Sequence, residues 1–157
     1  PVPTRASSDP TPVRCFPRKA SSPQVVAPGK RPFHTVSPAF LTKDGQPLVG
    51  FAVMGGNLLP QGHMQTLVRM LDYGQNPQAA CDAPRWRFNA GLEINVEAAM
   101  SPATVQGLRG LGHHLEVIND SYQDFGAGQF IWRAGDPSVE GYVAASDPRR
   151  DGAAAGY

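Results

Sequence analysis

Two apolar runs separated by a short turn constrain the fold of this chain more than any other feature. Residues 36–41 and 47–53 are almost continuously apolar, and Asp44-Gly45 lies between them. Asp-Gly between two apolar runs is a strong β-hairpin signal, because the residues of a tight hairpin turn need positive φ angles. Continuously apolar strands are typical of sheets covered on both faces. The sequence therefore predicts a hairpin with helices or other strands above and below it.

Three helices are predicted from residue spacing and capping signals. The first ends at Gly74 and carries apolar residues at i, i+3, i+4 and i+7, namely Met64, Leu67, Val68 and Leu71. Asn76-Pro77 opens a short helix that stops before Pro84. Ser101-Pro102 opens a third helix, which ends at Gly112.

Further strands are expected downstream of the hairpin, at residues 86–88, 92–96, 114–118, 129–133 and 139–144. These strands and the three helices follow one another in mixed order rather than in strict β-α-β alternation. This order favours an α+β fold or a layered sandwich.

The N-terminal part of the chain has a different composition from the rest. Residues 1–30 contain seven prolines and five Lys or Arg residues but one acid, Asp9. Such a segment buries too little surface to offset the entropy lost on ordering. Residues 1–24 are therefore expected to be disordered or unrelated to the folded part, which spans residues 25–157. A basic interaction arm is the alternative, but the bases are scattered.

Charge and composition exclude several classes of function. The 14 Lys plus Arg residues nearly balance the 13 Asp plus Glu residues, which gives no basis for a nucleic-acid partner. No apolar stretch approaches the roughly 18 residues of a membrane span. Cys15 and Cys81 lack the spacing of a disulfide framework or a zinc site. We expect no membrane, nucleic acid, metal or cofactor.

Gly55-Gly56 is the sharpest candidate for a chemical site. The two glycines follow an apolar strand and directly precede the first predicted helix. Paired glycines let consecutive N–H groups turn outward, and a helix start adds partial positive charge. This geometry stabilises an oxyanion. A turn that simply ends the strand is the alternative, and a phosphate loop is disfavoured because no Gly-Lys-Ser/Thr is present.

The titratable residues give no second site by local reasoning. The four histidines have no metal-ligand spacing, and no pair of carboxylates stands out. The acids downstream of Asp82 fall at turns and strand ends, so we expect them on the solvated surface. Local features alone thus indicate an α+β domain with one possible oxyanion site.

Several longer motifs occur in a fixed order. They are Gly29–Phe40, the hairpin, Met54-Gly55-Gly56, Leu71–Asn76, Asp82-Ala83-Pro84-Arg85, Ala145–Arg149 and Ala155-Gly156-Tyr157. Their order and spacing resemble the C-terminal part of the small subunit of the γ-glutamyltranspeptidase family. The resemblance covers residues 25–157, and it implies a partial αββα sandwich of the N-terminal nucleophile hydrolase type.

The resemblance also implies a reaction and a set of site residues. Family members free a threonine by self-cleavage of a precursor, and this threonine attacks a γ-glutamyl amide. The match assigns the backbone N–H groups of Gly55 and Gly56 to the oxyanion hole. The substrate-binding serine pair of typical members falls at His34 and Thr35. His-Thr is more like the γ-glutamyltransferase-like branch, which includes acylases, and suggests altered acyl specificity.

The nucleophile itself is not expected in this chain. In the family it lies well upstream of the Arg-Pro motif, whereas Thr4 and Thr11 stand in a Pro-rich context unlike a processing site. The chain is therefore expected to be a C-terminal fragment that is inactive alone. Its partners would be the upstream large-subunit and nucleophile segments of the same precursor, with a small γ-glutamyl or acyl-amide substrate. A non-catalytic binding domain or a remnant is the alternative, and the branch favours a cytoplasmic location.

Overall fold

The structure is a computed structural model that describes residues 25, 27–30 and 36–156. The segment 1–24, His34 and Thr35 lie outside the described residues. Residues from Ser37 onward form one compact unit of mixed strands and helices, which confirms the predicted α+β class. In this part of the chain no helix is long and apolar enough to cross a membrane.

The predicted hairpin is present at the start of this unit. Strand β1 (Ala39–Lys43) pairs with β2 (Gln46–Met54) in antiparallel fashion. The turn residues Asp44 and Gly45 have φ angles of 52° and 75°. Two successive positive φ angles are what a type I′ turn requires, and Asn-Gly and Asp-Gly supply them at low cost.

The hairpin belongs to a four-stranded sheet of order β1-β2-β6-β7. Strands β6 (Ala127–Arg133) and β7 (Tyr142–Ser146) add to β2 in antiparallel register. Both strands were predicted, and β6 begins two residues earlier than expected. The final strand begins at Tyr142 rather than at residue 139.

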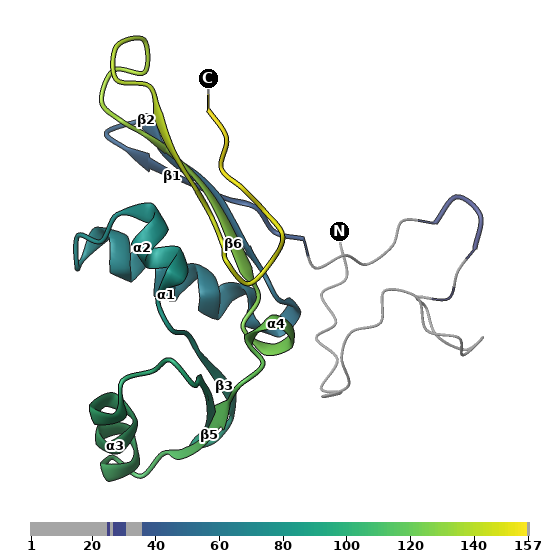
Figure 1. The fold of residues 1–157 in the computed structure, drawn as a ribbon. Helices are drawn as coiled ribbons and strands as arrows, with labels where there is room; N and C mark the ends of the chain where they lie inside the picture. The colour runs from purple at the N-terminus through teal and green to yellow at the C-terminus, as the bar shows by residue number, and fades with distance from the viewer. Residues whose placement is uncertain (1–24, 26, 31–35, 157) are drawn as a thin grey trace. The chain divides into compact units, whose positions relative to one another are not determined.

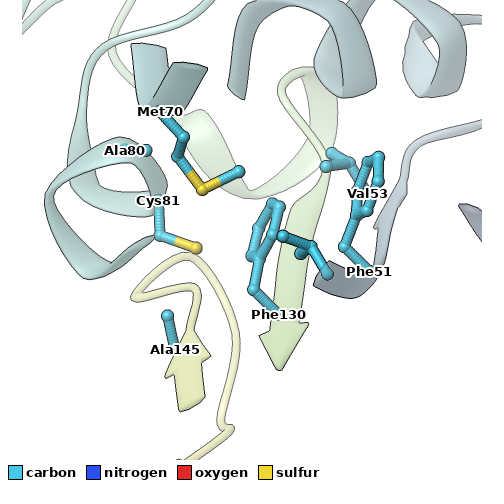
Figure 2. Packing of buried hydrophobic residues seen from close by; sticks show 8 residues of the cluster. Phe51, Val53, Met70, Ala80, Cys81, Phe130 and Ala145 are labelled. Atoms are coloured by element: carbon cyan, nitrogen blue, oxygen red, sulfur yellow. The ribbon is translucent and has the colours of Figure 1, made fainter. Parts of the chain in front are cut away.

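Helices α1 (Leu59–Leu71) and α2 (Pro77–Asp82) lie against one face of this sheet (Figure 1). Figure 2 shows the core between them, where Phe51 of β2 stacks on Phe130 of β6 with ring centroids 5.5 Å apart. The buried cluster comprises Val49, Phe51, Val53, Met70, Ala80, Cys81, Phe130 and Ala145. It joins three strands to both helices.

The opposite face of the sheet carries an apolar row that the described residues leave exposed, which corrects the prediction of strands covered on both faces. Beside this row, Gly152 lies against Gln129 and Ser146. Burial alternates along β2, because both helices pack on the same side. On the other side the register aligns one row across the sheet: Phe40, Gly50, Ile131 and Ala144. Phe40 and Ile131 are 64% and 57% exposed. The helices of the described chain thus cover one face of the sheet, although its apolar strands are of the kind found in sheets covered on both faces.

Helix α1 is present as predicted, but only part of the apolar stripe that revealed it faces the core, where Leu67 packs. Met64 and Leu71 are about half exposed. The buried positions are instead Gly62, Gln65, Thr66 and Met70. Small and polar side chains face inward because the helix lies very close to β2 and bonds to a neighbouring strand.

A second sheet has the order β3-β4-β5. Strand β3 (Trp86–Ala90) is antiparallel to β4 (Glu93–Glu97), which runs parallel to β5 (His114–Ile118). Helix α3 (Pro102–Gly110) connects the parallel pair, and the short α4 (Ser121–Asp124) leads into β6. The described residues hold seven strands, and each corresponds to one of the predicted strand ranges.

Both predicted N-caps are confirmed. The side chain of Asn76 accepts a hydrogen bond from the N–H of Ala79 at 2.8 Å. The Ser101 hydroxyl accepts one from the N–H of Thr104 at 3.1 Å. Each cap satisfies an N–H group that has no partner within its helix. Because cap and N–H group are only three residues apart, the Asn-Pro and Ser-Pro signals can be recognised from the local sequence.

Two glutamines of α1 tie the helix to the edge of the second sheet. Gln65 donates to the carbonyl of Trp86 at 2.8 Å and accepts from the N–H of Trp86 at 3.0 Å. Gln61 makes the same pair of bonds to Phe88, at 3.3 and 2.8 Å. Spaced four apart on one helix face, the two amides bond to β3 as a neighbouring strand would.

Candidate active site

The double glycine lies where β2 ends and the helical segment begins. Strand β2 ends at Met54, Gly55 follows with φ 149°, and Gly56 with φ 57° opens a short 3₁₀ turn, η1 (Gly56–Leu58). Helix α1 continues directly from that turn. Both φ values lie in the region that side chains disfavour, so the sequence Gly-Gly is required by this backbone path.

The N–H groups of this turn are available to a ligand. Neither Gly55 nor Gly56 donates a hydrogen bond to another residue of the described chain. The first turns of η1 and α1 contain no acidic side chain, so nothing there offsets the partial positive charge of the helical start. Two free donors in a positive environment can stabilise a developing oxyanion.

The two glycines are not equivalent. A Cβ added to Gly55 would lie 3.2 Å from Cβ of Leu58 and 3.3 Å from Cα of Gly126, whereas a Cβ on Gly56 would meet nothing within 4 Å. Gly55 is therefore held by close packing. Gly56 is exposed and faces open space, so it is the glycine that a substrate can approach.

Two consecutive residues of α1 fix the end of β2 just before the double glycine. A Cβ added to Gly62 would lie 2.6 Å from Cγ1 of Val53, so the helix comes closer to the strand than a larger residue allows. His63 Nε2 accepts a hydrogen bond from the N–H of Val53 at 2.9 Å. The imidazole also meets the Phe51 ring edge to face, at 5.0 Å.

The His63 contact predicts a pH dependence of stability. Burial lowers the pKa of His63, since its surroundings disfavour the charged form. The stabilising contribution of the neutral ring is complete above the unfolded pKa of about 6.5 and is lost as pH falls through the lower folded value. At pH 7.5 we expect His63→Phe to lower the free energy of unfolding by about 1–3 kcal/mol, because the N–H of Val53 loses its acceptor.

Urea unfolding of wild type and variant between pH 5 and pH 7.5 checks this, with the exposed His114→Phe as the control. The stability difference caused by His63→Phe should shrink as pH falls. A difference that stays constant over this range would contradict the contact.

A buried cluster of four charged side chains was not predicted. Arg85 pairs with Asp147 at 2.6 Å, and Arg149 pairs with Glu97 at 2.5 Å and with Asp147 at 3.0 Å. These side chains are between 0% and 7% exposed. The expectation that the acids lie on the surface is therefore wrong for Glu97 and Asp147.

The charges of this cluster compensate each other. Burial acts to raise the pKa of Asp147, but the Arg85 guanidinium and the N–H groups of Gly128 and Arg149 outweigh it, so the pKa is lowered. Burial also opposes ionisation of Glu97, whose pKa the contacts with Arg149 and Ser121 lower overall. Both carboxylates are therefore ionised at neutral pH.

The sequence did hold a signal for this cluster. Arg85 ends the motif Asp82-Ala83-Pro84-Arg85, and Arg149 ends Ser146-Asp147-Pro148-Arg149. Each motif places an arginine directly after a proline, and the fold brings the two together. Their pairing depends on contacts between distant elements, which local patterns do not reveal.

Cys81 is not a candidate nucleophile. It is fully buried, and burial raises the pKa of its thiol to about 12. A thiol in this state is not ionised at neutral pH and does not reach a substrate.

Comparison with known proteins identifies the family. Residues 5–157 match the profile of the family described as gamma-glutamyltranspeptidase. The chain belongs to this family. Over 135 residues it is 38% identical to the glutathione hydrolase-like YwrD proenzyme of Bacillus subtilis, covering 82% of this chain and 25% of that protein. It is 36% identical over 138 residues to the oxamate amidohydrolase proenzyme of Klebsiella pneumoniae, covering 84% and 25%.

A solved member of the same fold is cephalosporin acylase from Bacillus halodurans. It superposes with a TM-score of 0.74 at 42% identity, covering 91% of this chain and 26% of that one. The match confirms the predicted partial αββα sandwich of the N-terminal nucleophile hydrolase type. The chain spans about a quarter of the length of these relatives.

Proposed function

We propose that this chain supplies the oxyanion hole and part of the acyl pocket of a γ-glutamyltransferase-like amide hydrolase. The observation that carries the proposal is that the N–H groups of Gly55 and Gly56, at the start of a helical segment without acids, donate to no other residue among those the structure describes. Family membership supports it, because relatives of this chain are named for glutathione, oxamate and cephalosporin chemistry.

The proposed reaction is acyl transfer through a threonine in the upstream segments of the same precursor. Its hydroxyl oxygen attacks the amide carbonyl carbon while the threonine's own α-amino group takes the proton. The N–H groups of Gly55 and Gly56 hold the oxygen that becomes negative. Collapse returns the proton to the leaving amine, and water then releases the acid from the acyl-enzyme. We assign acyl binding to His34 and Thr35 on the family pattern.

The exposed apolar row of the four-stranded sheet supports a proposal for where the upstream segments bind. Phe40 and Ile131 are exposed in an apolar row that crosses all four strands. In an αββα sandwich a second sheet lies on this face, about 10 Å away. Three quarters of the length of the relatives lies outside the matched region, which is ample for such a sheet. We propose that the precursor's other sheet packs here.

We also propose a cytoplasmic location for the enzyme. Cys81 is a free thiol, and a buried thiol of this kind suits a reducing compartment.

The reading frame upstream of this chain is the first test. An in-frame large subunit that ends before a threonine supports the enzyme, and a stop or frameshift near residue 24 supports a remnant. The complete precursor, meaning this chain with those upstream segments, is then assayed with glutathione, a γ-glutamyl anilide and a glutaryl amide. We expect γ-glutamyl substrates to be turned over and the 157-residue chain alone to show no hydrolysis.

Two results would overturn parts of this proposal. Equal turnover of acyl groups with and without the α-amino group would remove the γ-glutamyl assignment. Hydrolysis by the 157-residue chain alone would show that its nucleophile does not lie upstream.

A further inference from the structure

The segment Phe125–Gly128 lies directly against the double-glycine turn. Gly126 has φ 64°, and a Cβ added to it would lie 1.9 Å from the carbonyl oxygen of Met54. Its Cα would lie 3.3 Å from a Cβ on Gly55. Ala127 is the register partner of Met54 across β2 and β6. A shift of this segment would therefore move the backbone at Gly55.

Arg85 and Asp147 hold this segment at both ends. Arg85 Nη1 donates to the carbonyl of Phe125 at 2.9 Å, and Arg85 Nη2 donates to Asp147 at 2.6 Å. Asp147 Oδ2 accepts from the N–H of Gly128 at 2.8 Å, while the N–H of Asp147 donates to the carbonyl of Gly128 at 3.0 Å. The two side chains are 1% and 0% exposed, so water does not compete for these bonds.

Arg149 and Glu97, the other two members of the cluster, bond mainly around the end of α2. Arg149 donates to the carbonyls of Cys81 and Ala83 and binds Glu97 through two nitrogens. Glu97 accepts from the N–H of Arg85 and makes no hydrogen bond or ion pair with residues 125–128 of the described chain. Arg85 and Asp147 thus bond to the segment, whereas Arg149 links Glu97 to the end of α2 and also donates to Asp147 at 3.0 Å.

We propose that Arg85 and Asp147 are positioning residues for the oxyanion hole, acting through Phe125–Gly128. The proposal rests on the proposed function, since it concerns the geometry of Gly55 and Gly56. The guanidinium of Arg85 bonds to Phe125 and Asp147 through two different nitrogens. A lysine has a single ammonium nitrogen and does not reproduce this two-nitrogen geometry. Small displacements of a catalytic donor lower turnover strongly, because stabilisation of the transition state depends on its placement.

The test compares Arg85→Lys and Asp147→Asn with Glu97→Gln in the complete precursor. Glu97→Gln is the matched control, because it removes a charge from the same buried cluster away from the segment. kcat and KM are measured per mature enzyme with the best substrate, and the thermal midpoint on the same samples. We expect kcat to fall about 10-fold to 100-fold in the first two variants with little change in KM. In Glu97→Gln we expect a lowered midpoint and kcat within about twofold of wild type.

Three results would overturn the proposal: normal kcat in the folded fraction of Arg85→Lys and Asp147→Asn, an equal kcat loss in Glu97→Gln, or failure of both test variants to fold. The last would make the pair a requirement for folding rather than for loop geometry. Gly56→Ala, measured in parallel, separates a failure of the proposed function from a failure of the positioning role. If it leaves kcat unchanged, the proposed function itself fails; if it lowers kcat while Arg85→Lys does not, only the positioning role fails.

Discussion

Replacing Asp147 with alanine is expected to lower the free energy of unfolding by about 3–5 kcal/mol, because it leaves the buried Arg85 guanidinium without its counter-charge. The acceptor for the N–H of Gly128 is lost as well. Urea unfolding followed by tryptophan fluorescence measures the loss. Trp86 and Trp132 lie in β3 and β6, so the signal reports both sheets.

The control for this prediction is Asp151→Ala, which removes an exposed carboxylate four residues further on. An exposed substitution of this kind should change stability by no more than about 0.5 kcal/mol. Because the pKa of Asp147 is lowered, its contribution is complete above the unfolded value of about 3.9 and is lost as pH falls below it. Equal losses in the two variants would show that the buried pair contributes nothing specific.

Much of the secondary structure could be predicted because its signals are local. The Asp44-Gly45 turn and the caps at Asn76 and Ser101 act through residues two or three positions away. The double glycine is also local, since its backbone angles are set by the glycines themselves. These features can be recognised in the sequence without knowledge of the tertiary fold.

The features that were missed depend on distant partners. Arg85 and Asp147 are 62 residues apart, and the Pro-Arg motifs beside them do not by themselves show that Asp147 is buried rather than solvated. Gly126, which packs on Met54, lies just before β6, a strand that follows the whole second sheet in the chain. The inward face of α1 could not be predicted for the same reason. Gln65 is buried because it bonds to Trp86 of another element, and not because it is hydrophobic.

Gly56→Ala is expected to lower kcat of the complete precursor by about 10²–10³, because it misdirects a donor to the oxyanion. The fold should survive, since an added Cβ meets nothing within 4 Å. The cost in stability is that of a positive φ, roughly 1–2 kcal/mol for a residue other than glycine. Gly45→Ala is the matched control. Gly45 has φ 75° and the same open space around its Cβ, but it lies in the hairpin turn at the far end of β2.

The most direct test of the account is to measure kcat and the thermal midpoint of Gly56→Ala, Gly45→Ala and wild-type precursor on the same preparations. We expect similar midpoints for the two variants and a kcat loss of about 10²–10³ in Gly56→Ala alone. Normal kcat in the folded fraction of Gly56→Ala, with a lowered midpoint, would contradict it. The double glycine would then be a turn that ends β2 and not an oxyanion hole.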